Sequence, residues 1–198
     1  MPQADEAGDW ALERYRPYLR ILAGVRVGPL LRAKLDASDL VQEALLKAHA
    51  KRAQCRGRTE AERLAWLRRI LATTLADLHR RYGRDKRDAG LERSLEQALE
   101  QSSLCLGKLL ADEQPTPSAA YDEADRQVCL AEALTRLPES QRMALTLRYL
   151  HDPPCSLADI ARQLDRTEKA AAGLVSRGLE TLRKILRTPE DRGHEHPR

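Results

Sequence analysis

The chain has 198 residues, of which 42% are hydrophobic, and a formal net charge of +4. This length suffices for one domain or two small ones with a hydrophobic core, and the composition is that of a soluble globular protein. No apolar run approaches the roughly 20 residues that a membrane-spanning helix needs, and the N-terminus lacks the apolar core of a signal peptide. We therefore predict a cytoplasmic protein that makes no use of a membrane.

The cysteines do not follow the spacing of a metal site or of a disulfide framework. The four are Cys55, Cys105, Cys129 and Cys155. They are widely separated, without a C-x-x-C pair or a histidine at ligand spacing, so reduced thiols are expected. We predict no metal ion and no cofactor.

The charge is unevenly distributed along the chain. Residues 51–88 carry twelve Lys or Arg against five Asp or Glu, and residues 166–187 carry six against two. Between them, residues 89–128 carry three against eight. Two basic segments therefore flank an acidic one. Each basic segment alone could be a solvated face, but together they favour nucleic acid, because Lys and Arg gain affinity by displacing condensed counterions.

The apolar periodicity predicts an all-α fold. Glycine and proline cluster at a few breaks, β-branched residues are scarce, and no segment alternates as a strand should. In the N-terminal half the apolar spacing predicts helices over 9–25, 36–52 and 59–83.

The helix predicted over 36–52 has one apolar face and one polar face. Asp36 and Ser38 could cap its start. Its apolar stripe consists of Leu40, Val41, Ala44, Leu45 and Ala48. This stripe leaves Asp39, Gln42 and Glu43 facing outward, and their i, i+3, i+4 spacing puts all three on one face.

The helix predicted over 59–83 is apolar on one side and rich in arginine on the other. Its buried stripe consists of Leu64, Leu67, Ile70, Leu71, Thr74 and Leu78. Trp66 lies in the same apolar register, so we expect it to pack in the core. The arginine-rich face could be a solvated surface or a surface that meets DNA, and the helix alone does not decide between them.

An acidic connector is expected to divide the chain into two domains. The charge changes sign after residue 88, and the stretch "EQPTPSAAYDEAD" has two prolines and no sustained apolar stripe. The piece "LERSLEQALEQSSLCLGKLL" within the connector has some helical spacing. We place the domain boundary between residues 90 and 125.

The stretch "SLADIARQLDRTEKAAAGLVSRGLETLRK", residues 156–184, has the pattern of a helix-turn-helix. Ser156 and Asp159 fit a capping box for the first helix, Asp165 and Arg166 turn the chain, and Thr167 caps the second. A helix that enters the major groove presents its first turns to base edges, so the start of the second helix is expected to read sequence.

Three stretches resemble one known family, in the order in which that family has them. "DASDLVQEALLKA" resembles the D-x-x-D-L-V-Q-E signature of sigma region 2. "WLRRILATTLADLHRR" is similar to the promoter-contacting helix of the same domain, and "LTRLPESQRMALTLRYL" with the following helix-turn-helix resembles sigma region 4. The chain is thereby identified, over most of residues 10–187, as a member of the sigma-70 family of RNA polymerase sigma factors, of the extracytoplasmic-function type.

The resemblance implies an architecture of two small helical domains joined by a linker. Sigma region 2 would occupy residues 9–88 and sigma region 4, with its helix-turn-helix, residues 126–187. An acidic linker would span 89–125, and 188–198 would form a flexible tail.

The resemblance also implies roles for residues of the first domain. Asp39, Gln42 and Glu43 match the positions that bind the clamp helices of the polymerase β′ subunit. The positions that meet the minus-10 element are matched by Asp77, Arg80 and Arg81 in the helix and by Arg56 and Arg58 in the preceding loop. Thr73 stands where family members often have Asn, so no amide contact to a base is expected there.

In the second domain the resemblance implies that the second helix of the helix-turn-helix reads a minus-35 element. The candidate readers are Arg166, Thr167, Glu168, Lys169, Ala172, Ser176 and Arg177. The Ser-Arg pair that is frequent in this helix of the family aligns with Gly173 and Leu174. The promoter sequence therefore cannot be inferred by analogy.

The predicted function is that of a sigma factor, which binds core RNA polymerase and directs initiation at minus-35 and minus-10 elements without catalysis of its own. An anti-sigma factor is a further candidate partner. A stand-alone helix-turn-helix regulator is the alternative, but it leaves "DLVQEALLKA" without a role. An enzyme is the least favoured class, because the sequence has no P-loop, metal-ligand set or nucleophile-base spacing.

Overall fold

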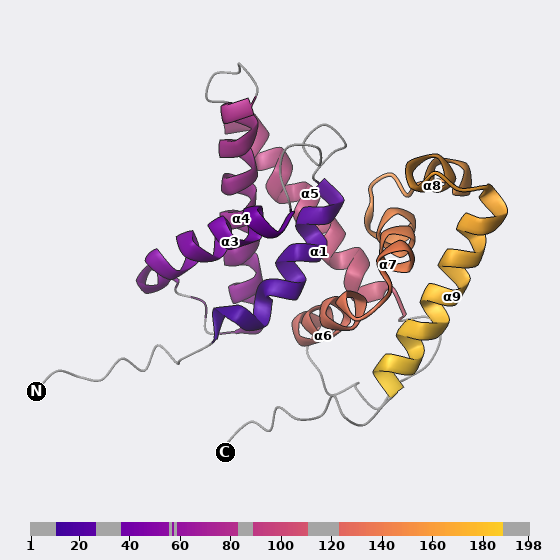
Figure 1. The fold of residues 1–198 in the computed structure, drawn as a ribbon. Helices are drawn as coiled ribbons and strands as arrows, with labels where there is room; N and C mark the ends of the chain where they lie inside the picture. The colour runs from indigo at the N-terminus through magenta and orange to yellow at the C-terminus, as the bar shows by residue number, and fades with distance from the viewer. Residues whose placement is uncertain are drawn as a thin grey trace, which may run out of the picture.

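The computed structural model describes residues 11–26, 37–55, 57, 59–82, 89–110 and 123–187. The described residues form helices and their connections, with no strand among them (Figure 1). None of the helices in these ranges is long and apolar enough to cross a bilayer.

The N-terminal part begins with three α-helices at the expected places. A short 3-10 turn over Leu12–Tyr15 leads into α1 (Arg16–Arg26), followed by α3 (Ala37–Ala50) and α4 (Glu60–Tyr82). All five predicted stripe residues of α3 and all six of α4 are buried, as periodicity predicted. Trp66 is partly buried against the same core.

A fourth N-terminal helix, α5 (Ala89–Lys108), occupies the first part of the segment expected as a linker. It packs along α4 and also contacts α1 and α6. Its buried face consists of Leu99, Ser102, Ser103 and Leu106, with the half-buried Leu95 one turn earlier. The two serines interrupt the apolar stripe, which is why periodicity alone gave only a weak helical signal here. Residues 111–122 lie outside the described part, so the exact domain boundary stays a prediction.

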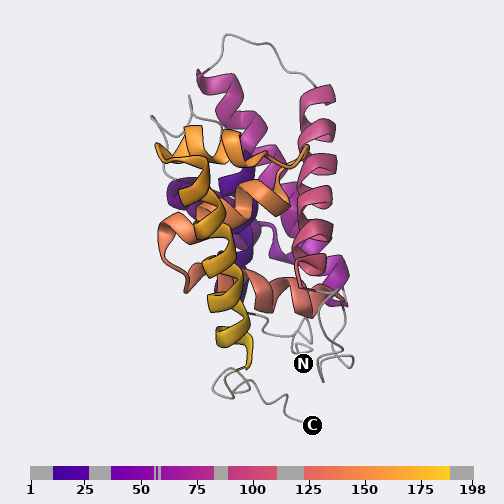
Figure 2. The same ribbon diagram turned by 90° about the vertical axis from the view of Figure 1, so that its right-hand side faces the viewer.

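The C-terminal part consists of α6 (Glu123–Thr135), α7 (Glu139–Leu145), a π-helical turn over Thr146–Leu150, α8 (Leu157–Leu164) and α9 (Glu168–Arg187). Helices α8 and α9 form the predicted helix-turn-helix. A small cluster of buried side chains between them and α7, which includes Ile160 and Ala171, fixes their packing. Figure 2 shows α9 along the outside of the molecule.

Local capping explains why α8 stops after eight residues and α9 begins at once. The Ser156 hydroxyl accepts the Asp159 amide while the Asp159 carboxylate accepts the Ser156 amide, which completes the predicted capping box. Asp165 ends α8 in the left-handed region at φ 53°, and the Arg166 amide donates back to the Ala161 carbonyl at 2.9 Å. The Thr167 hydroxyl then accepts the Ala170 amide at 3.2 Å at the start of α9.

The two halves of the chain share one hydrophobic core. Its buried members run from Tyr15 in the first 3-10 turn to Leu182 in α9, with Leu99 and Leu106 of α5 and Leu134 of α6 between them. Helix α6 packs against α1, α4 and α5. The C-terminal part is therefore docked on the N-terminal part and is not held at a distance by an extended linker.

Buried hydrogen bonds fix this junction. The Ser103 hydroxyl lies 2.7 Å from the Tyr18 hydroxyl and donates to Gln127 Oε1 at 2.5 Å, so one side chain of α5 joins α1 to α6. The Ser102 hydroxyl donates to the Leu150 carbonyl at 2.8 Å. Because buried polar groups are costly without partners, these bonds favour one docking geometry over others.

Candidate functional site

The outward face of α3 is polar, as predicted, but it also carries an exposed leucine. Asp39 and Gln42 are exposed and Glu43 is half-buried. Leu46 follows at i+3 from Glu43 and is 64% exposed, more than any other large hydrophobic side chain of the described residues. Sequence reasoning missed Leu46 because it stands beside Leu45 in an apolar run. A single exposed leucine is common on protein surfaces and does not by itself mark an interface.

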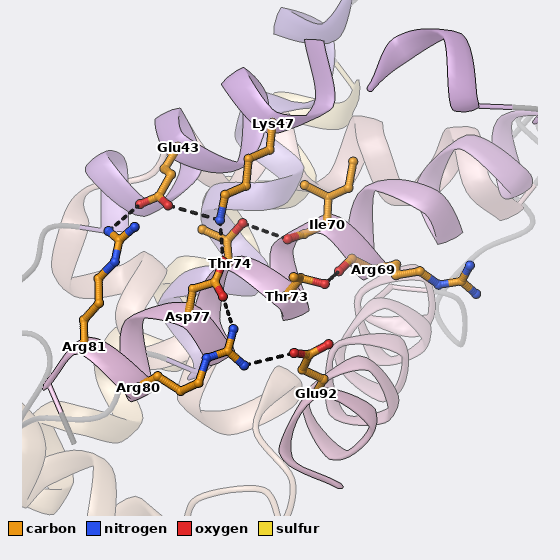
Figure 3. Close-up of polar contacts among 10 residues, drawn as sticks. All are labelled: Glu43, Lys47, Arg69, Ile70, Thr73, Thr74, Asp77, Arg80, Arg81 and Glu92. Atoms are coloured by element: carbon orange, nitrogen blue, oxygen red, sulfur yellow. Dashed lines mark hydrogen bonds and ion pairs between the residues drawn. The ribbon is translucent and has the colours of Figure 1, made fainter. Parts of the chain in front are cut away.

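A chain of ion pairs connects this face of α3 to α4 and α5 (Figure 3). Lys47 Nζ lies 3.1 Å from Glu43 Oε1 and 2.7 Å from Asp77 Oδ2. Asp77 also pairs with Arg80, whose Nη1 lies 3.0 Å from Glu92 Oε1 on α5. Lys47 thus joins a candidate polymerase-binding residue to candidate minus-10 residues, and Glu92 extends the network to α5. The sequence singled out neither Lys47 nor Glu92.

Asp77 is held as a carboxylate by its two cationic neighbours. Partial burial alone would raise its pKa, but the hydrogen bond and charge of Lys47 and the charge of Arg80 outweigh it and lower the pKa of Asp77. A carboxylate committed to Lys47 and Arg80 repels phosphate and positions the Arg80 guanidinium. Asp77 thus holds Lys47 and Arg80 in place, and its contact with the minus-10 element stays a prediction.

Every arginine of α4 has a partner within the protein. Arg63 lies 3.5 Å from Glu60, and Arg68 donates to the Tyr18 hydroxyl at 3.0 Å. The other pairs are Arg69 with Glu96 at 3.2 Å, Arg80 with Asp77 and Glu92, and Arg81 with Glu43 at 3.7 Å. Carboxylates of α3 and α5 therefore pair with this face, although Arg69 and Arg81 remain 71% and 64% exposed.

Thr73 lies on the same helix and has its hydroxyl bonded. It donates to the Arg69 carbonyl at 3.0 Å, one turn earlier. The hydroxyl proton of Thr73 is thus used within its own helix, while the oxygen keeps its capacity to accept a hydrogen bond.

The loop before α4 is anchored at the helix start. Thr59 and Glu62 form a capping box, in which the Glu62 amide donates to the Thr59 hydroxyl at 3.3 Å and the Thr59 amide to Glu62 Oε2 at 3.1 Å. A Cβ at Gly57 would lie 3.0 Å from Glu62 Cβ and 3.1 Å from the Arg63 amide nitrogen, so only glycine fits without a shift. Arg56 and Arg58 themselves lie outside the described residues.

The candidate minus-35 residues gather on one exposed surface at the start of α9. Six of the seven are exposed and Ala172 is half-buried; the six are Arg166, Thr167, Glu168, Lys169, Ser176 and Arg177. The three basic side chains among them, Arg166, Lys169 and Arg177, form no ion pair within the described residues. This surface therefore differs from the arginine-rich face of α4, since its cations remain available to an outside partner.

Gly173 and Leu174 have distinct structural roles in α9. Leu174 lines a hollow with Met143 and Leu164, between α9 and the helices α7 and α8. A Cβ at Gly173 would lie 3.1 Å from Arg177 Nη1, so the glycine makes room for the Arg177 guanidinium against the helix. Neither side chain carries a polar group, and which residues read the minus-35 element stays a prediction.

No three described side chains of His, Cys, Asp or Glu come together as possible metal ligands.

Two family models match the chain. Residues 11–85 match sigma-70 region 2, and residues 127–182 match sigma-70 region 4. A comparison with curated proteins finds no match for the chain.

Proposed function

The chain belongs to the sigma-70 family of the extracytoplasmic-function type, and we propose that it acts as a sigma factor in promoter recognition. It binds core RNA polymerase through α3 and reads minus-10 and minus-35 elements through α4 and α9. The family consists of initiation factors and not of enzymes.

The observation that carries this proposal is the separation of two exposed surfaces with different chemistry. The α3 face combines Asp39 and Gln42 with the exposed Leu46, a mixture suited to a protein partner. The start of α9 is polar and basic, which suits DNA. Helices α3 and α9 lie on opposite sides of the molecule in Figure 1, so one partner need not exclude the other.

Run-off transcription from genomic fragments tests the proposal. Core polymerase is assayed with and without the protein, and new discrete transcripts are expected only when both are present. A protein that binds DNA but forms no complex with core polymerase would instead support the stand-alone helix-turn-helix regulator.

The α3 surface can be tested with the variant Asp39→Ala/Gln42→Ala/Leu46→Ala. These side chains are exposed, so the free energy of unfolding should change by less than about 1 kcal/mol. Affinity for core polymerase should fall at least tenfold, because loss of interface anchors typically costs about 2 kcal/mol or more. Glu43 is left intact because it pairs with Lys47 and Arg81, so that its removal would also change the free energy of unfolding.

The control is Gln97→Ala/Glu132→Ala, which changes two exposed residues of α5 and α6. It should bind core polymerase like the unmodified protein. A folded α3 variant with undiminished affinity would rule out this surface as the docking site.

A further inference from the structure

Helix α5 covers the basic face of α4 with complementary charge. The pairs Arg80 with Glu92 and Arg69 with Glu96 both join α4 to α5. Arg68 also reaches α5, with Nη1 at 3.4 Å from the Ser103 hydroxyl. Three of the five α4 arginines are thus engaged by one helix that follows α4 in the chain and runs antiparallel to it.

These contacts use the groups that a nucleic acid backbone would need. A guanidinium binds carboxylate and phosphate with the same fork of N–H donors, so Glu92 and a phosphate would compete for Arg80. The Arg69–Glu96 pair is at the surface, where Arg69 is 71% exposed and Glu96 38% exposed, whereas the Arg80 side chain of the other pair is 24% exposed. Exposed pairs of this kind are weak enough for a polyanion to displace.

From this arrangement we infer that α5 is an internal competitor for single-stranded DNA, with Glu92 and Glu96 occupying arginines of α4 until their carboxylates are displaced. The inference rests on the proposed function, because it assigns the α4 face to promoter DNA. It adds a regulatory contact, since the free protein would bind the opened strand poorly until another interaction draws the carboxylates of Glu92 and Glu96 away.

The same helix has a reason to stay in place in the free protein. Leu99 and Leu106 of α5 are fully buried, and Ser102 and Ser103 bond to groups of the C-terminal part. The carboxylates of Glu92 and Glu96 can therefore exchange partners while the apolar side of α5 remains packed. Neutralising Glu92 and Glu96 should free the guanidinium groups of Arg80 and Arg69 without unfolding α5.

The test compares Glu92→Gln/Glu96→Gln with the control Glu100→Gln/Glu132→Gln in the full chain. Both variants remove two negative charges, and neither Glu100 nor Glu132 forms an ion pair within the described residues. The probe is a fluorescein-labelled oligothymidylate of twelve nucleotides, titrated by anisotropy at several salt concentrations. Circular dichroism verifies that each variant is folded.

We expect the Glu92/Glu96 variant to bind the probe at least threefold more tightly than the control. Its salt dependence should also be steeper, by about 0.7 in the log–log slope for each additional phosphate that the protein neutralises. Adding Arg69→Gln and Arg80→Gln should abolish the increase in affinity, because the freed guanidiniums are then missing. Glu96→Gln alone, at the exposed rim, should give a part of the increase.

Equal affinity of the two double variants would overturn the inference, and so would an increase in affinity that persists without Arg69 and Arg80. Run-off transcription with the unmodified protein separates this failure from failure of the proposed function. If the protein initiates transcription but the Glu92/Glu96 variant binds the probe no more tightly, only the role of α5 is refuted. If no transcript or complex with core polymerase forms, the proposed function fails whatever the probe shows.

Discussion

Two glycines in the middle of α9 differ in the atoms that surround them. A Cβ at Gly178 would lie 3.1 Å from Leu145 Cγ and 3.5 Å from Gln141 Cβ, both on α7. A Cβ at Gly173 would meet only the flexible end of the Arg177 side chain. Gly178 allows α7 and α9 to pack closely, whereas Gly173 mainly lowers the stability of α9.

The same substitution should therefore have opposite effects at the two positions. Gly173→Ala should stabilise the protein by about 0.5–1 kcal/mol, because alanine restricts the unfolded chain and favours the helix. Gly178→Ala gains the same preference but overpacks the contact with Leu145, at a typical cost of about 1–3 kcal/mol. Urea unfolding of the two variants measures the difference. A Gly178 variant as stable as the Gly173 variant would contradict the close approach of α7 and α9.

Tyr15 makes the stability of the fold depend on pH in the alkaline range. The side chain is buried and its hydroxyl donates to Glu60 Oε2 at 2.9 Å. Burial, reinforced by the negative charge of Glu60, raises the pKa of Tyr15 to about 12. In the unfolded chain the phenol ionises at about 10, so the unfolded state releases its proton first. The contribution of Tyr15 to stability is present below about pH 10 and is lost as the pH rises toward 12.

Tyr15→Phe tests this dependence, because phenylalanine keeps the ring and removes the ionisable group. At pH 8 the variant should be less stable by about 1 kcal/mol through loss of the hydrogen bond. The urea midpoints of the two proteins should converge between about pH 10 and 11.5, as the unmodified protein loses stability faster. A constant gap across this range would mean that Tyr15 ionises at its ordinary pKa.

At the scale of elements, α5 is a structural helix and not a tether. Leu99 is fully buried, whereas Leu104 on the same helix is 43% exposed. Leu99→Ala should lower the free energy of unfolding by about 2–5 kcal/mol, as expected for a buried leucine. Leu104→Ala should cost less than about 1 kcal/mol. Equal, small effects at both positions would mean that α5 is a linker in solution.

Limited proteolysis addresses the same element without substitution. The sequence pattern alone places the domain boundary anywhere between residues 90 and 125. With α5 packed on α4, residues 90–108 should be as resistant as α4 itself, because a protease requires local unfolding of a packed helix. Mass spectrometry of the earliest fragments locates the cut. Early cleavage within α5 would contradict its packing.

At the scale of the whole molecule, the shared core predicts that the two halves unfold together. Both tryptophans, Trp10 and Trp66, belong to the N-terminal half, so tryptophan fluorescence follows that half alone. Leu134→Ala in α6 removes a side chain from the shared core. It should lower the midpoint of the fluorescence transition as much as that of the helical signal, because destabilisation passes through the common core.

Ile160→Ala is the matched control in the C-terminal half. Ile160 is fully buried but belongs to the separate small cluster of the helix-turn-helix. Its loss should lower the fluorescence midpoint less than the loss of Leu134 does. If Leu134→Ala changes the helical signal and leaves the fluorescence transition untouched, the two domains unfold independently.

The sequence by itself determined the features that depend on neighbouring residues. Helical periodicity located α1, α3 and α4 and the buried stripes of α3 and α4, and the Ser156 capping box with the turn at Asp165 located the helix-turn-helix. These signals are short-range, because caps and helical stripes connect residues that are only three or four apart.

Only the tertiary structure decided which polar groups are already in use. Ser102 and Ser103 break the stripe of α5 in the sequence, yet their hydroxyls bond to groups 48 and 85 residues away along the chain. The sequence did not decide whether the arginines of α4 face solvent or DNA, and in the structure α3 and α5 supply carboxylates to three of them. No local pattern reveals such pairings, because the free energy of a charge depends on the partners that folding brings to it.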